Sequence, residues 1–446
     1  MRRYPAYKDS GVEWLGEVPE GWEVVLSRRL FRQTRDDALN DDEQLSATQK
    51  SGVIPQRIFM EQEDQKVVLA LSGTSNFKHV EAGDFVISLR SFQGGIEYSA
   101  HTGCVSPAYT VLRAIKKLDS AYFRFLLKSD AYISVLQSVT SGIRDGRNVS
   151  YDQFGNIGVP LPPLPEQRAI AAFLDRETAK IDALVEEQRR LIALLAEKRQ
   201  AVISHAVTRG LNPDAPLKPS GIDWLGDIPE AWEMRELKHL VAEGTTITYG
   251  IVQAGPEYEG GIPYIRTSDM SGKQLPVSGF PLTSPEIECA YVRSRVFPGD
   301  IVIAIRATIG KALPVPDELA MANLTQGTAK ISPGRNCCRD FLLFALASPC
   351  AQIYFDLMAK GATFREITLD ALRRLPVPVP TLEEQRRIAA FLTSETAKLD
   401  TLTDIATTAI ALLQERRAAL ISAAVTGKID VRDLSPQSIS ECLEPA

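Results

Sequence analysis

Apolar residues recur at intervals of four and three along two long stretches of this chain. They are Ile170, Leu174, Ile181, Leu184, Leu191, Leu195 and Val202 in the first stretch, and Ile388, Leu392, Leu399, Leu402, Ala409, Leu413 and Leu420 in the second. This spacing, kept for more than four heptads, is typical of a coiled-coil seam. Because isolated helices of this length need a partner for the seam, we predict two long helices that pack on each other.

Boundary signals flank both predicted helices. Pro165 suits a first helical turn, where its missing N–H costs nothing. Thr381 and Glu384 have the spacing of a capping box, and Gly210 and Gly427 are suitable residues to follow a helix end. Each helix is predicted to run for about 44 residues, or roughly 65 Å at 1.5 Å per residue.

Charged residues interrupt the seam at equivalent positions of the two helices. Glu177 corresponds to Glu395, and Lys198 corresponds to Arg416. If the helices are antiparallel about a pseudo-twofold axis near positions 188 and 406, Glu177 approaches Arg416 and Lys198 approaches Glu395. A parallel pair would oppose like charges, so we predict the antiparallel arrangement, with these pairs fixing register. The alternative is that all four side chains are solvated at the edge of the seam.

The helices belong to a longer internal repeat. Residues 7–30 and 217–240 share the frame K-x-SG-x-x-WLG-x-x-PE-x-WE, which contains all four tryptophans of the chain. GDFVISLR (83–90) resembles GDIVIAIR (299–306), and both are typical of buried strands, here ending in arginine. The helical segments then match at a constant offset of 218 positions. Repeats with this arrangement indicate two tandem copies of one unit.

The repeat predicts an α+β fold in which two mixed α/β domains are joined by the antiparallel helices with pseudo-twofold symmetry. The expected boundaries are residues 1–156 for the first domain, 157–215 for the first helix and linker, 216–374 for the second domain, 375–430 for the second helix, and 431–446 for a polar tail. The four tryptophans recur in both copies, so we interpret them as core residues or as anchors between domain and helix.

Composition narrows the classes of function. The chain has no apolar run near the roughly 20 residues that cross a bilayer and no apolar stretch after its N-terminus, so we expect a cytoplasmic protein without membrane contact. The spacing of cysteines and histidines suggests no metal site. Phosphate-binding loops, nucleophile elbows and zinc-protease motifs are missing, which favours a binding protein without a catalytic site. The net charge of −6 argues weakly against nucleic-acid binding, but a local basic face or a basic partner would offset it.

These motifs resemble a known family. The duplicated WLG-x-x-P-x-x-W segment, the GD strand ending in arginine, and the helix LP-x-x-EQ-x-x-IAxFL-x-x-ET-x-x-D are similar to the specificity subunit of type I restriction–modification systems. The resemblance covers residues 7 to 428. It implies two target-recognition domains that each read one half of a split, asymmetric site in double-stranded DNA, with two conserved helices as a rigid spacer between them.

The resemblance also implies partners. Two modification subunits would carry S-adenosylmethionine and methylate adenine N6, and restriction and translocation subunits would use ATP and Mg²⁺, so that no cofactor is expected in this chain. The outward helix residues Gln167, Arg168, Gln385 and Arg386 would then face the modification subunits. The competing interpretation of these four is a solvated helix face.

Candidate DNA contacts are basic, amide and hydroxyl side chains on loops that follow the shared strands, because such groups hydrogen-bond base edges and phosphates. They are Arg90, Ser91, Gln93, Arg144, Arg147 and Asn148 in the first domain, and Arg266, Thr267, Ser268, Arg306, Thr308, Gln326, Lys330 and Arg365 in the second. Arg90 and Arg306 could instead form internal ion pairs with Asp84 and Asp300.

Two other functions stay open on the sequence alone. A coiled-coil adaptor whose domains bind protein would have the same seam. A specificity subunit of a related fused restriction–methylation system would differ only in its partner subunits. Steep salt dependence of duplex binding is expected for the DNA-binding interpretations and not for the adaptor.

Overall fold

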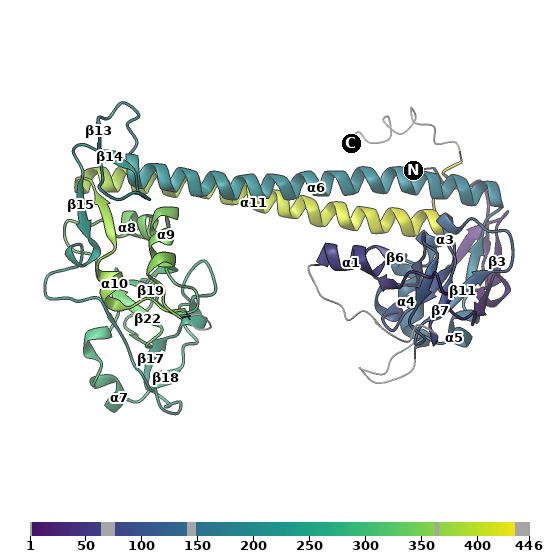
Figure 1. The fold of residues 1–446 in the computed structure, drawn as a ribbon, viewed down its shortest axis with the longest axis horizontal. Helices are drawn as coiled ribbons and strands as arrows, with labels where there is room; N and C mark the ends of the chain where they lie inside the picture. Colours follow the sequence, from purple (N-terminus) through teal and green to yellow (C-terminus); the bar gives the residue numbers. More distant parts are fainter. Residues whose placement is uncertain (1, 64–75, 141–148, 362–364, 433–446) are drawn as a thin grey trace. The chain divides into compact units, whose positions relative to one another are not determined.

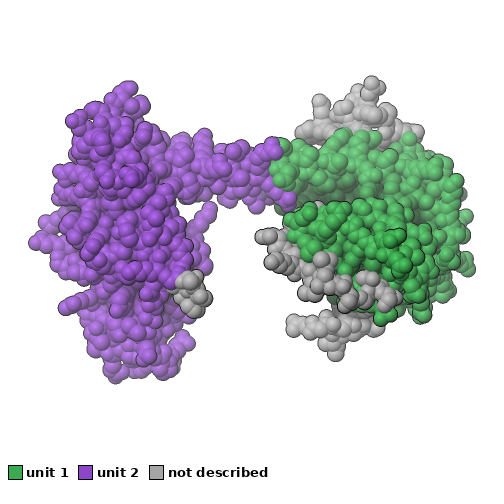
Figure 2. All heavy atoms as spheres, in the orientation of Figure 1, with its two compact units in different colours: residues 1–188, 408–446 green, residues 189–407 purple. Residues whose placement is uncertain are grey.

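The computed structural model describes residues 2–63, 76–140, 149–361 and 365–432. It divides into two compact units, which are coloured separately in Figure 2. Unit 1 contains residues 1–188 and 408–446, and unit 2 contains residues 189–407. Each unit therefore combines one of the predicted globular domains with parts of both long helices.

Unit 1 is built around a four-stranded antiparallel sheet with strand order β4-β11-β8-β9. The elements of its globular domain are β1 (Tyr7–Asp9), β2 (Glu17–Pro19), β3 (Glu23–Leu26), the 3₁₀ helix η1 (Ser27–Arg29), β4 (Phe31–Thr34), β5 (Leu45–Thr48), β6 (Gly52–Pro55), α1 (Gln56–Glu63), β7 (Lys78–Val80), β8 (Phe85–Ile87), α2 (Ser91–Gly94), β9 (Glu97–Tyr98), β10 (Gly103–Val105), β11 (Thr110–Ala114), α3 (Ser120–Leu126), α4 (Asp130–Val139), α5 (Tyr151–Gly155) and β12 (Gly158–Leu161).

Unit 2 repeats this sheet with strand order β16-β22-β19-β20. Its domain contains β13 (Leu217–Pro219), β14 (Asp227–Pro229), β15 (Glu233–Glu236), η3 (Leu237–His239), β16 (Thr248–Tyr249), β17 (Ile262–Ile265), η4 (Thr267–Met270), β18 (Leu282–Thr283), α7 (Pro285–Cys289), η5 (Val292–Ser294), β19 (Ile301–Ala304), β20 (Ala312–Pro314), β21 (Asn323–Leu324), β22 (Thr328–Ile331), α8 (Arg339–Ala347), α9 (Pro349–Met358), α10 (Leu369–Arg373) and β23 (Pro376–Val379).

The predicted shared strands form the centre of both sheets. β8 and β19 are buried along their whole length, as their β-branched apolar runs indicate. In unit 1 the core continues through edge-to-face contacts of the Phe31 ring with Phe85 at 5.5 Å and with Phe123 at 5.2 Å. Such aromatic pairs add about 0.5–1.5 kcal/mol beyond the burial of their area. The mixed α/β fold of both domains is as predicted.

The two long helices are α6 (Leu164–Arg209, 46 residues) and α11 (Leu382–Val425, 44 residues). Both end just before a predicted glycine in the left-handed region, with φ of +77° at Gly210 and +76° at Gly427. The capping box at the start of α11 is only half formed. The Thr381 hydroxyl accepts the Glu384 N–H at 3.3 Å, but the Glu384 carboxylate accepts the indole N–H of Trp232.

In each unit the two helices run side by side in opposite directions (Figure 1), so the predicted antiparallel coiled coil is confirmed. The predicted charge pairs are wrong. Asp182 pairs with Arg417 in unit 1, and Asp400 pairs with Arg199 in unit 2, both at 2.9 Å. These two pairs are equivalent under the 218-residue offset, so the repeat extends to the register of the helices.

The predicted seam charges have nearer partners on their own helices. Glu177 pairs with Arg176 and Lys180, each at 3.0 Å, and Glu395 pairs with Lys398 at 2.6 Å. Lys198 and Arg416 are exposed, one position before the arginines that reach across. Each arginine meets an aspartate that lies five positions after the predicted glutamate, which places the helices in a different register.

Most of the predicted apolar seam is buried, but three of its residues are exposed and three are partly buried. The residues that are buried as predicted are Ile170, Leu174, Ile181, Leu195, Ile388, Leu392, Leu399 and Leu420. Val202, Ala409 and Leu413 are partly buried, whereas Leu184, Leu191 and Leu402 are 51%, 42% and 47% exposed. Near the middle of the helices, Val185 and Ala406 are buried in place of these leucines. A straight α-helix drifts about 20° per heptad from a strict repeat, which accounts for this change.

Gly427 gives a test of how closely α11 approaches domain 1. An added Cβ would meet Pro19 Cδ at 2.4 Å in addition to the left-handed strain, whereas at Gly16 (φ +63°) it would meet nothing within 4 Å. We expect Gly427→Ala to lower the free energy of unfolding by about 2–4 kcal/mol and Gly16→Ala by about 1 kcal/mol. Urea unfolding of the full chain measures both. Equal losses would contradict the close packing.

Candidate nucleic-acid interface

A buried indole attaches each domain to the start of a long helix. Trp22 Nε1 donates to Glu166 Oε1 at 3.1 Å, and Trp232 Nε1 donates to Glu384 Oε2 at 3.2 Å. The Tyr4 hydroxyl also donates to Glu166 Oε1, at 2.6 Å. The interpretation of the tryptophans as anchors is confirmed for this pair. The two glutamates were not among the predicted site residues, although their position in the shared EQ motif was a signal that could have found them.

The neighbouring glutamines complete the attachment, which corrects their assignment to a subunit interface. Gln167 is 2% exposed; its Oε1 accepts the Asp119 N–H at 2.9 Å and its Nε2 donates to the Pro162 carbonyl at 2.8 Å. Gln385 is 1% exposed, and its Oε1 accepts the Cys338 N–H at 2.7 Å. Both amide partners precede a helix, α3 or α8, so each glutamine occupies its hydrogen-bonding groups inside its own unit.

The arginines that follow these glutamines remain outward. Arg168 is exposed and lies 3.8 Å from the Asp119 carboxylate, and Arg386 is exposed. Of the four helix residues that we assigned to partner contacts, these two keep side chains that another subunit could reach.

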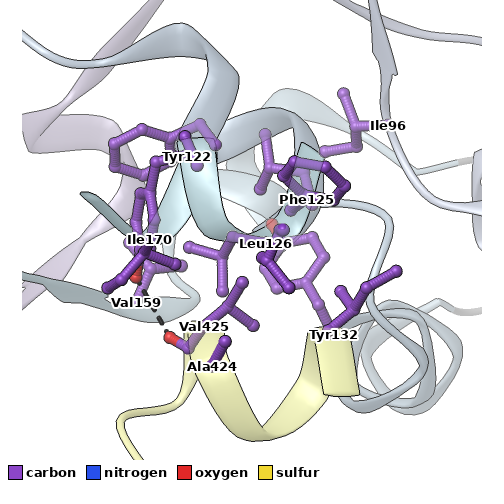
Figure 3. Packing of buried hydrophobic residues seen from close by; sticks show 14 of the residues in the cluster. Ile96, Tyr122, Phe125, Leu126, Tyr132, Val159, Ile170, Ala424 and Val425 are labelled. Atoms are coloured by element: carbon purple, nitrogen blue, oxygen red, sulfur yellow. Dashed lines mark hydrogen bonds between the residues drawn. The ribbon is translucent and has the colours of Figure 1, made fainter. Parts of the chain in front are cut away.

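The far end of α11 is held by domain 1 as well. The buried Tyr122 hydroxyl donates to the Val425 carbonyl at 3.0 Å (Figure 3). Burial raises the pKa of Tyr122 well above its usual value, so the hydroxyl keeps its proton as donor. Domain 1 therefore contacts the first turn of α6 and the last turn of α11.

In domain 1 the segment after β8, which includes the short helix α2, offers two side chains for DNA. Arg90 and Gln93 are exposed. Ser91 is 1% exposed, and its hydroxyl accepts the Ser88 N–H at 2.9 Å, so Ser91 shapes the turn and is a poor candidate for DNA contact. Asp84 pairs with Arg113 at 2.9 Å, and among the described residues no ion pair joins Arg90 to Asp84, so the alternative for Arg90 is wrong. The other three candidates, Arg144, Arg147 and Asn148, lie outside the described residues.

In domain 2 a groove of about 970 Å³ brings candidates from separate loops together. Thr308 and Arg365 both line it, and Lys273, Gln274 and Lys311 add amine and amide groups that were not predicted from the sequence. Ala307 beside Thr308 has φ of +60°, in the left-handed region that disfavours a residue with a Cβ. Such strain is concentrated at functional sites, so this turn is the strongest candidate for DNA contact in domain 2.

Acidic neighbours hold three of the arginines predicted to contact DNA. Arg306 pairs with Glu366 at 2.7 Å and not with Asp300, and Arg365 pairs with Asp356 at 2.9 Å. Arg266 donates to both oxygens of Asp269, at 2.9 and 3.2 Å. All three arginines are exposed, so each can exchange its carboxylate for a phosphate or a guanine edge.

The remaining candidates differ in exposure. Ser268 is exposed, and Thr267 and Gln326 are half-buried. Lys330 is wrong as a DNA contact: it is 9% exposed, its amine donates to the Arg295 carbonyl at 2.6 Å, and it lies 3.5 Å from Asp300. A buried lysine that is already paired has no reach to DNA.

A groove of about 570 Å³ in unit 1 lies between its domain and the helices. The Asp182–Arg417 pair lines this groove, just as Arg199 and Asp400 line the groove of unit 2. Glu97 on its wall is 1% exposed and bonds Lys128 Nζ at 2.8 and 2.9 Å. Burial raises the pKa of this carboxyl to about 7, although Lys128 opposes the shift.

Two absences concern the described residues only. They contain no group of three or more His, Cys, Asp or Glu side chains placed to hold a metal ion. They also include no single helix long and apolar enough to cross a bilayer, although the bent pair α8 and α9 passes that test together.

Comparison with known families decides what kind of interface this is. The family model for the type I restriction modification DNA specificity domain matches the chain twice, over residues 19–192 and 229–411. The chain belongs to this family. The two matched segments, the specificity domains, fall on the two copies of the repeat, so the predicted resemblance is confirmed.

Individual relatives extend the match along the chain. The type I restriction enzyme EcoBI specificity subunit of Escherichia coli is 27% identical over 75% of this chain and 72% of its own length. The putative MjaX specificity subunit of Methanocaldococcus jannaschii is 24% identical over 94% of this chain and 96% of its own.

Solved structures share the fold. A chain from a study of complex assembly and conformational transition of the type I R-M system has a TM-score of 0.66 at 22% identity, and covers 92% of this chain and 99% of its own. The HsdS subunit from Thermoanaerobacter tengcongensis has a TM-score of 0.55 at 19% identity, and covers 92% and 98%.

The buried glutamine predicts an asymmetry between neighbours in the EQR motif. Gln385→Ala would leave the Cys338 N–H without its acceptor at the contact between domain 2 and the start of α11. We therefore expect a loss of about 1–3 kcal/mol in unfolding free energy. Arg386→Ala removes an exposed side chain and should change it by less than about 0.5 kcal/mol. Urea unfolding of the two variants makes the comparison. A larger loss for Arg386→Ala would contradict the role of Gln385 in attaching domain 2 to α11.

Glu97 predicts a pH dependence of stability. Its pKa of about 7 lies above the ordinary value of 4.5, so the folded chain keeps a proton that the unfolded chain releases between these values. The stability that Glu97 contributes is therefore present below pH 4.5 and falls as pH rises to 7, by on the order of 2 kcal/mol. Urea midpoints from pH 5 to 8 should show this slope in the wild type and not in Glu97→Gln.

The exposed Glu81→Gln provides the matched control for this measurement, because Glu81 also pairs with a cation but lies at the surface. It should keep the wild-type slope. If the difference in unfolding free energy between the wild type and Glu97→Gln does not change from pH 5 to 8, the prediction is contradicted. Lys128 would then keep Glu97 ionised in the folded chain.

Proposed function

We propose that this chain recognises a split DNA site, with one half read by each specificity domain, and that it directs partner subunits to that site. The observation that carries the proposal is the double family match on two domains that share a four-stranded sheet, each attached to a long helix by the same tryptophan, glutamate and glutamine. Two similar readers on a common scaffold are the arrangement that symmetric DNA-binding dimers use for paired half-sites.

The two half-sites should differ in sequence. The loop after β8 presents Arg90 and Gln93, whereas the equivalent loop after β19 presents Arg306 and Thr308. Arginine can bond guanine in two places and glutamine can do so with adenine, while threonine gives a single hydroxyl. Different side chains on equivalent loops therefore support an asymmetric target.

We further propose that catalysis belongs to partners. In this proposal two modification subunits methylate adenine N6 with S-adenosylmethionine, and restriction and translocation subunits use ATP and Mg²⁺, in the cytoplasm where chromosomal DNA lies. Exposed leucines recur at equivalent positions of α6 and α11, and they support a docking surface for the modification subunits, together with Arg168 and Arg386. They are Leu184 with Leu402 and Leu194 with Leu412.

Methylome sequencing tests the function. Cells that express the chain with its modification subunits should gain one split adenine-methylation motif, which disappears when the chain is deleted. Replacing residues 1–156 by the first domain of another specificity subunit should change one half of the motif and leave the other half and the gap unchanged. Replacing residues 216–374 is the reciprocal control. A change in both halves after one exchange would contradict separate reading.

A further inference from the structure

Five basic residues meet at one end of the domain 1 sheet. Arg28 and Arg29 end η1, Arg32 lies on β4, and Lys116 and Lys117 follow β11. The antiparallel register pairs Phe31 with Ala114, and the Ile115 N–H donates to the Leu30 carbonyl at 2.9 Å. Because Ile115 contacts Leu30, the lysines that follow Ile115 and the arginines that precede Leu30 lie at the same end of the sheet. We call these five residues the basic end face.

This face carries positive charge that no carboxylate of the described residues neutralises. All five side chains are exposed, and none forms an ion pair with another described residue. The side chain of Arg28 donates to the neutral amide of Asn156 at 2.9 Å. Arg113, opposite Arg32 in the sheet, shows the usual alternative, because it contacts three carboxylates. Helix α5 packs on η1 and contributes one acidic residue, Asp152.

Domain 2 does not repeat the face, although it repeats the backbone. The Gly334 N–H donates to the Leu240 carbonyl at 2.8 Å, as Ile115 does to Leu30. At the equivalent positions Lys238 is paired with Glu236, Arg335 keeps a cation in place of Lys116, and His239, Ala242 and Asn336 replace the other three basic residues. The fold therefore does not require all five charges of the basic end face.

Protection of an exposed strand edge is one alternative explanation. β4 is an edge strand, and charged side chains discourage edge-to-edge pairing. That accounts for Arg32, which lies on the strand, but not for the other four residues, which lie outside it.

Docking of an acidic protein is the second alternative. A stable interface covers about 800 Å² per partner around an apolar centre. Ile115 is 49% exposed, and among the described residues it is the one large apolar side chain exposed on this face. Five cations with so little apolar surface fit a phosphate backbone better.

We propose that the basic end face binds backbone phosphates of duplex DNA outside the half-site that domain 1 reads. The inference rests on the proposed DNA recognition. Ile87, at the end of β8, pairs with Thr110 at the start of β11, so the reading loop and the basic end face lie at opposite ends of the sheet. That separation is about 20 Å, or roughly six base pairs at 3.4 Å per step.

The experiment compares the assembled complex of this chain and its modification subunits with a complex that carries Arg28→Gln, Arg29→Gln, Lys116→Gln and Lys117→Gln. Two duplexes are used: one with about 20 base pairs beyond the domain 1 half-site, and one trimmed at its edge. On the long duplex we expect the variant to bind on the order of ten-fold more weakly near 0.1 M salt, with a flatter salt dependence. On the trimmed duplex the two complexes should bind alike.

The matched control is Lys238→Gln with Arg335→Gln, at the equivalent end of domain 2, which should leave binding to both duplexes unchanged. Equal binding of wild type and variant to the long duplex would overturn the inference. So would equal weakening on both duplexes, or loss of the modification subunits from the purified variant, which would assign the face to a protein. Failure of the wild-type complex to discriminate any DNA sequence would instead count against the proposed function.

A second variant guards against a folding defect. Lys116→Gln with Lys117→Gln alone removes two charges outside η1 and β4, and should give about half of the change in salt slope. Its thermal unfolding should match that of the wild type. Wild-type binding by this folded variant would also overturn the inference.

Discussion

The hydrogen bond between a buried indole and a glutamate at the start of a long helix is the contact on which this architecture depends. Trp22 holds Glu166, which is buried, and Trp232 holds Glu384, which is partly buried, so each carboxylate needs a specific donor at the contact between domain and helix, here called the joint. The glutamine that follows each glutamate, Gln167 or Gln385, accepts a hydrogen bond from a backbone N–H of the domain. If either partner is removed, the other loses its hydrogen bond where water reaches it poorly. The angle between domain and helix can therefore change little.

Each joint also receives the end of the other helix. Gly427 lies against the ring of Trp22, and Gly210 lies against the ring of Trp232 and the Glu384 carboxylate. A side chain at either glycine would separate the indole from the helix end. The constraint therefore acts on residues that are far apart in sequence, and it explains why the tryptophan segment, the EQ motif and the terminal glycine recur together in both copies.

The sequence predicted the parts of the fold that follow from periodic patterns and local turn chemistry. Helix ends, the central strands and the antiparallel orientation depend on such signals. The register did not follow, because Arg416 and Arg417 are adjacent cations and only the geometry of the helices decides which of them crosses. Leu184 and Leu402 were assigned to the seam by a strict heptad, which straight helices do not keep.

Candidate DNA contacts were harder to predict, because residue type does not report burial. Lys330 and Gln167 carry groups suited to binding, yet tertiary contacts occupy those groups. Glu166 and Glu384 look like ordinary charges of a first helical turn, and only the folded domain shows their donors. Arg90, Thr308 and Arg365 remain candidates because they are exposed on loops, which is a property of the fold.

Some contacts occur in both copies of the repeat, and other features occur in one copy alone. The joints and the cross-helix pairs Asp182–Arg417 and Arg199–Asp400 are the same in both units, so they serve the common architecture. The hairpin of β5 and β6 occurs in unit 1, and the parallel pair of β17 and β21 occurs in unit 2. The basic end face belongs with these differences. Domain 2 forms the same backbone with only two cations at these five positions, one of them paired with a carboxylate. Folding therefore does not explain the full set of five in domain 1, and a partner that domain 1 contacts does.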